Sequence, residues 1–134
     1  MTKRKTIVCG MPRSGNNLIN KMLRHYGFET CVRHFDQAIP EGVEFAILPL
    51  RHQQSHWASC KAHDEGYIKL EDIHYEHYWP ILRNLAKRGI IVIPVVYEEI
   101  VEFPDRVGRH IATILDFKWK GWPAEIYNGN RKYE

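Results

Sequence analysis

Residues 6–19 read TIVCGMPRSGNNLI and join a short apolar run, a glycine-flanked turn and the start of an amphipathic pattern. The apolar, mostly β-branched run 6–9 predicts a buried strand that ends at Gly10. From Asn16 apolar residues recur every three or four positions, which predicts a helix that stops at Gly27. A strand, a glycine-flanked loop and a helix in this order are typical of a phosphate-binding loop, because amide N–H groups and the helix dipole point toward an anion.

The rest of the chain continues this alternation. Apolar runs predict three more strands, at 28–32, 45–50 and 90–96. Amphipathic or mixed patterns predict three more helices, at 52–63, 72–88 and 104–115. Strands without a polar face that alternate with helices are typical of a parallel sheet covered on both sides. We therefore expect a three-layer α/β fold with a central parallel sheet of about four strands, in one domain over residues 1–134.

Composition and charge narrow the class of protein. The chain is 44% hydrophobic and 26% charged, as globular proteins are. Its net charge of +3 fits a small anionic ligand better than a nucleic acid. The apolar run 90–96 is far shorter than the roughly 20 residues of a membrane-spanning helix. Three cysteines with no CxxC pair favour a reducing compartment, so we expect a cytoplasmic protein without membrane contact.

The loop differs from a Walker A loop in the residues that bind magnesium and the outer phosphates. The spacing from Gly10 to Gly15 matches GxxxxG, but Asn16 and Asn17 stand where Lys and Ser or Thr are needed. The third expected strand also leads into Arg51 rather than an acidic residue. These differences disfavour a magnesium-dependent ATPase, GTPase or kinase. The cation of the loop is Arg13 instead.

The segment PRSG between a strand and a helix resembles the PKSGTT or PRSGTT loop of sulfotransferases, which holds the donor 3′-phosphoadenosine 5′-phosphosulfate. In that family an arginine at a later strand end and a serine eight residues on, as in VRDPRDVAVS, bind the donor's 3′-phosphate. Here Arg51 ends the expected strand 45–50 and Ser59 follows at that spacing. The segment 97–100 is similar to the family's RYEDL. The three matches occur in the family's order over about residues 5–116.

The resemblance implies roles for individual residues. Arg13 stabilises the leaving phosphate, and His34 is the general base, with Asp36 as the rival carboxylate. A histidine's ordinary pKa near 6.5 suits proton abstraction at neutral pH. The residues implied to bind the donor, or its product adenosine 3′,5′-bisphosphate, are Arg13, Ser14, Gly15, Asn16, Asn17, Arg51 and Ser59.

Departures from the family leave alternatives open. Asn16 and Asn17 replace two threonines that contact donor phosphate, and Leu18 stands where cytosolic members have a tryptophan that stacks on adenine. His52 and His56 have a spacing that could hold zinc, but no further ligand is obvious, so we expect no metal.

The first expectation is a sulfotransferase-like enzyme whose hydroxyl or amine acceptor the sequence does not identify. The alternatives are a degenerate P-loop module that binds a nucleotide or phosphate without catalysis, and a small-molecule kinase.

Overall fold

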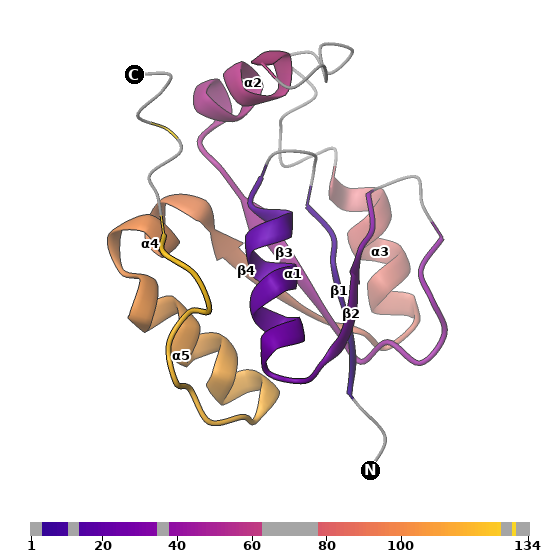
Figure 1. Cartoon of the computed structure of the whole chain (residues 1–134). Helices are drawn as coiled ribbons and strands as arrows, with labels where there is room; N and C mark the ends of the chain where they lie inside the picture. The colour runs from indigo at the N-terminus through magenta and orange to yellow at the C-terminus, as the bar shows by residue number, and fades with distance from the viewer. Residues whose placement is uncertain (1–3, 11–13, 35–37, 63–77, 127–129, 131–134) are drawn as a thin grey trace.

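The structure, a computed structural model, contains a four-stranded sheet in which every strand pair is parallel. It describes residues 4–10, 14–34, 38–62, 78–126 and 130. The strand order is β2-β1-β3-β4 (Figure 1), where the strands are β1 (Lys5–Val8), β2 (Glu29–Val32), β3 (Phe45–Leu50) and β4 (Ile91–Val96). The expected three-layer α/β fold is confirmed.

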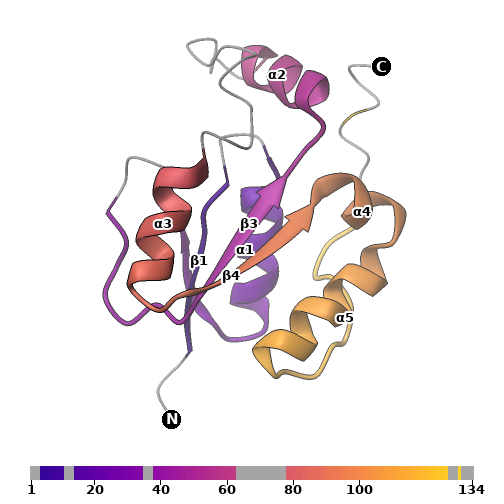
Figure 2. The same cartoon turned by 180° about the vertical axis from the view of Figure 1, so that it is seen from behind.

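Helices cover both faces of the sheet. One face carries α1 (Asn16–His25), α4 (Tyr97–Glu102) and α5 (Pro104–Leu115). The opposite face carries α3 (Trp79–Lys87), which is in front in Figure 2. Helix α2 (Gln53–Ala62) lies beyond the carboxyl ends of the strands. No helix in the described ranges is long and apolar enough to cross a membrane.

Successive strand side chains alternate between two cores. On β1, Ile7 belongs to the core beneath α3, whereas Val8 belongs to the core beneath α1 and α5. On β3, Ala46 and Ile47 divide in the same way. Because neighbouring residues of a strand point to opposite faces, a run without a polar face fits a sheet that is covered on both sides.

The element boundaries agree closely with those expected, with two differences. Helix α3 begins at Trp79, and the earlier part of the expected helix, residues 72–77, lies outside the described residues. Helix α4 was not expected as a helix, because its six residues are too few to show a helical period.

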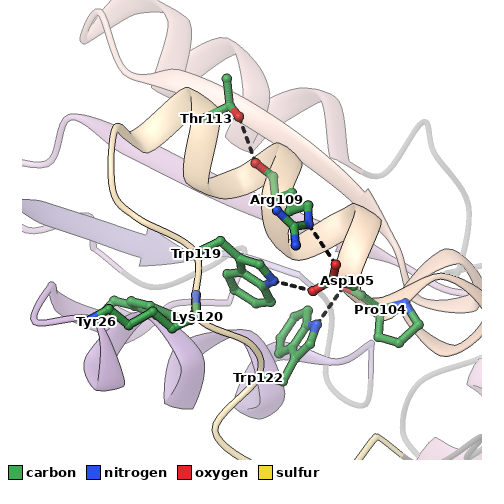
Figure 3. A network of polar contacts seen from close by, with 8 residues as sticks. All are labelled: Tyr26, Pro104, Asp105, Arg109, Thr113, Trp119, Lys120 and Trp122. Atoms are coloured by element: carbon green, nitrogen blue, oxygen red, sulfur yellow. Dashed lines mark hydrogen bonds and ion pairs between the residues drawn. The ribbon is translucent and has the colours of Figure 1, made fainter.

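Two tryptophan side chains hold the segment that follows α5 against that helix through hydrogen bonds (Figure 3). Trp119 Nε1 donates a hydrogen bond to Asp105 Oδ1 at 2.6 Å, and Trp122 Nε1 donates to the backbone oxygen of Pro104 at 2.7 Å. Asp105 also accepts from Arg109 Nε at 2.7 Å. The hydrogen bonds from Arg109 and Trp119 hold the pKa of Asp105 below its ordinary value.

Helix α1 holds the same segment from the other side. The Tyr26 hydroxyl donates to the backbone oxygen of Gly121 at 2.6 Å and accepts from the backbone N–H of Lys120 at 2.8 Å. The Trp119 ring lies flat against α5 at Gly108, where a Cβ atom would stand 2.1 Å from ring atom Cζ2. The chain therefore leaves α5 along a fixed path across α1 and α5.

We expect Gly108→Ala to lower the free energy of unfolding by about 1–3 kcal/mol, because the added methyl group overpacks against Trp119. Helix propensity alone predicts the opposite sign, a gain of about 1 kcal/mol. Urea unfolding measures the difference, with His110→Ala on the exposed face of α5 as the control. A variant as stable as the wild type would show that Trp119 is not held against the helix.

Candidate anion-binding site

The order of the strands marks one place where a ligand is expected. The chain leaves β1 for β2 on one side and later places β3 on the other side of β1. In parallel sheets ligands bind outside the carboxyl ends of the strands at such a reversal. The loop that follows β1 and Arg51, which follows β3, both lie at this edge.

The loop after β1 is closed by a reciprocal pair of hydrogen bonds. Asn16 Nδ2 donates to the backbone oxygen of Gly10 at 3.0 Å, and the Gly10 N–H donates to Asn16 Oδ1 at 2.9 Å. The Asn16 side chain is buried. Both polar atoms of its carboxamide therefore brace the loop, and the predicted contact of Asn16 with the donor stays a prediction.

The two glycines that flank the loop leave no room for a side chain. A Cβ at Gly10 would stand 2.3 Å from Ser14 Oγ and 2.7 Å from Pro49 Cγ. Gly15, the N-cap of α1, has φ +107°, and a Cβ there would stand 3.3 Å from Tyr97 Cδ2. A positive φ is accessible to glycine at little cost. The loop therefore begins and ends in close contact with β3 and α4.

Arg51 lies beside this loop because one aromatic ring contacts both. Its Cζ is 4.6 Å from the centroid of the Tyr97 ring, within the range of a cation–π contact. Tyr97 is the same ring that limits the space at Gly15. The structure therefore brings the loop and the strand-end arginine together, as a ligand with two anionic groups requires.

Two polar residues that the sequence did not single out complete this edge. Arg51 Nε donates to Asn130 Oδ1 at 2.7 Å, and Asn130 Nδ2 donates to Glu98 Oε1 at 3.2 Å. Glu98 Oε1 also accepts from the backbone N–H of His52. The sequence did not predict that Asn130 would lie beside Arg51. The similarity of segment 97–100 to RYEDL did not assign Glu98 a role at this edge.

His34 lies on the other side of the loop. The Arg33 N–H bonds to the backbone oxygen of Val8 at 2.9 Å and so extends β2 alongside β1. His34 Nδ1 then lies 3.3 Å from the backbone oxygen of Gly10. A carbonyl oxygen only accepts, so Nδ1 carries the proton in this contact and the lone pair of the neutral ring is on Nε2. That tautomer is the one that a proton acceptor needs.

The other site residues predicted from the sequence differ in how exposed they are, and two of them lie outside the described residues. Asn17 is exposed on the first turn of α1, and Ser14 is fully buried. Ser59 is 2% exposed within α2, and its predicted contact with the 3′-phosphate stays a prediction. Arg13 and Asp36 lie outside the described residues, and their roles stay predictions.

Cys9, between β1 and the loop, is not a nucleophile at neutral pH. Burial raises the pKa of its thiol to about 12, and Sγ lies 3.5 Å from the backbone oxygen of Ile47. A protonated, buried thiol is unreactive. Among the described residues no three His, Cys, Asp or Glu side chains gather where they could hold a metal ion.

No protein-family model and no curated protein sequence matches the chain. Its function is therefore inferred from the chemistry of this edge of the sheet.

We expect Asn16→Ala to lower the free energy of unfolding by about 1–3 kcal/mol, because the Gly10 N–H and C=O lose their partner in a buried place. Asn17→Ala is the matched control, since its exposed side chain should change stability by less than about 0.5 kcal/mol. Chemical unfolding of both variants measures the contrast. Equal losses would mean that the carboxamide of Asn16 does not brace the loop.

Proposed function

We propose that the chain is a sulfotransferase-like enzyme that binds 3′-phosphoadenosine 5′-phosphosulfate and transfers its sulfonate to a hydroxyl or amine. One observation carries the proposal. The Tyr97 ring contacts Arg51 on one side and adjoins Gly15 of the loop, so two anion-binding elements are neighbours. A nucleotide with phosphate on both its 3′ and 5′ positions matches two such elements.

The loop provides the part of the site for the 5′-phosphosulfate. Gly15 caps α1, so amide N–H groups of the first turn face the open edge of the sheet, where the helix dipole also favours an anion. Arg13 adds a cation to this loop, in the role that the sulfotransferase resemblance implies. The loop lacks the hydroxyl that holds magnesium in a Walker A loop, so we expect binding without Mg²⁺.

Arg51 provides the part of the site for the 3′-phosphate. A guanidinium binds phosphate through two parallel, charge-assisted hydrogen bonds. The Tyr97 ring beneath it, 4.6 Å away, restricts the guanidinium plane. In this role Tyr97 is a positioning residue, because it acts on the ligand through Arg51.

His34 is the proposed general base. The acceptor oxygen or nitrogen attacks sulfur while the bond from sulfur to the 5′-phosphate oxygen breaks, and adenosine 3′,5′-bisphosphate leaves. The acceptor's proton passes to Nε2 of His34, since Nδ1 donates to the Gly10 oxygen. Charge that develops on the leaving phosphate is stabilised by the loop.

One observation favours the second candidate, a module that binds the nucleotide without catalysis. Asn16, which stands where the family has a phosphate-binding threonine, uses its carboxamide to brace the loop. A site with fewer groups on the transferring sulfonate stabilises the transition state less. The two candidates share the ligand and differ only in turnover.

Arg51→Ala should weaken the binding of adenosine 3′,5′-bisphosphate about 10- to 100-fold, because hydrogen bonds to a charged group are lost. Adenosine 5′-phosphosulfate, which has no 3′-phosphate, should bind with nearly unchanged affinity. Titration calorimetry in EDTA measures both ligands, with Arg24→Ala on the exposed face of α1 as the control. If both ligands weaken alike, Arg51 does not bind the 3′-phosphate.

His34→Gln should abolish sulfonate transfer while bisphosphate affinity stays within about twofold, because an amide still donates to Gly10 but takes no proton. A transfer assay with donor labelled in the sulfonate, run over a panel of alcohols, phenols and amines, measures turnover. Full activity in the variant assigns the base elsewhere, with Asp36 as the next candidate. Binding without transfer by the wild type supports the binding module.

A further inference from the structure

Arg51 already has a hydrogen-bond partner on one of the two guanidinium edges that can bind an anion. Its Nε donates to Asn130 Oδ1 at 2.7 Å. Together with a terminal nitrogen, Nε forms the side edge of the guanidinium, one of the two edges that grip phosphate or carboxylate in a bidentate way. A phosphate that binds at this edge must therefore replace the carboxamide oxygen.

The carboxamide of Asn130 fits between a cation and an anion. Its oxygen accepts from Arg51, and its Nδ2 donates to Glu98 Oε1 at 3.2 Å. Glu98 Oε2 is buried and makes no hydrogen bond among the described residues, so Glu98 depends on the partners of Oε1. The neutral amide thus forms hydrogen bonds with the Arg51 guanidinium and the Glu98 carboxylate at once. Asn130 is 7% exposed.

The preceding chain keeps Asn130 within reach of Arg51. Trp119 and Trp122 fasten the segment after α5 to Asp105 and Pro104, and Tyr26 holds it to α1 (Figure 3). From there the described chain passes α4 toward the carboxyl edge of the sheet (Figure 1). Because Trp122, eight residues before Asn130 in the sequence, is held to Pro104, Asn130 competes at a high effective concentration.

We propose that Asn130 is a built-in competitor for the anion site, which caps Arg51 until a phosphate group of the nucleotide displaces it. The competitor role presupposes the proposed function and adds regulation to it. The affinity of the site depends on the position of the C-terminal segment. Bound nucleotide in turn releases Asn130 from both Arg51 and Glu98.

Asn130→Ala should therefore bind adenosine 3′,5′-bisphosphate about three- to tenfold more tightly than the wild type, because one charge-assisted hydrogen bond no longer competes. Asn130→Asp should bind it more weakly, because a carboxylate pairs with Arg51 and repels the ligand. Titration calorimetry measures both affinities, and Asn84→Ala, on the exposed face of α3, is the control that should not change.

A double-mutant cycle assigns the effect to Arg51. In an Arg51→Ala background, Asn130→Ala should no longer change the affinity for the bisphosphate. Unchanged or weaker binding by Asn130→Ala in the otherwise wild-type chain overturns the competitor role alone. If neither the wild type nor Asn130→Ala binds the bisphosphate, the proposed function fails and the competitor role with it.

Discussion

The Tyr97 ring is the contact on which the candidate site depends. The Arg51 guanidinium lies against the Tyr97 ring, and the same ring would be 3.3 Å from a Cβ at Gly15, whose φ of +107° favours glycine. Because Tyr97 begins α4 directly after β4, the sheet itself fixes this ring. The carboxyl end of the sheet therefore sets the spacing between Gly15 and Arg51 in the candidate site.

The fold could be predicted from the sequence wherever the pattern of apolar residues extends over a whole strand or helix. The runs 45–50 and 104–115 coincide with β3 and α5 because burial on two faces, or on one helical stripe, leaves a clear pattern. The segment 116–126 has no such pattern, because single hydrogen bonds such as Trp119 to Asp105 hold it rather than an amphipathic face. Contacts of this kind depend on where two distant segments meet, and this is known only once the chain has folded.

The candidate site was predictable only in part, for a related reason. Strand ends place Arg51 and His34 beside the loop, since parallel strands end at a common edge. Spacing does not say whether a side chain forms hydrogen bonds with its own backbone, and the bonds between the Asn16 carboxamide and Gly10 were not predicted from the sequence. Asn130 is 79 residues from Arg51 in the sequence, so their contact is known only from the folded structure.

The path of the C-terminal segment has a practical consequence for work with this protein. Whatever polypeptide is joined after Glu134, a natural extension or an affinity tag, starts only a few residues from the side chain that caps Arg51. Charged tags at that end, polyhistidine among them, would add charge near the Arg51 guanidinium and could change what the candidate site binds. The amino end leads into β1 at the opposite edge of the sheet (Figure 1), which makes it the safer place for a fusion partner or a surface tether.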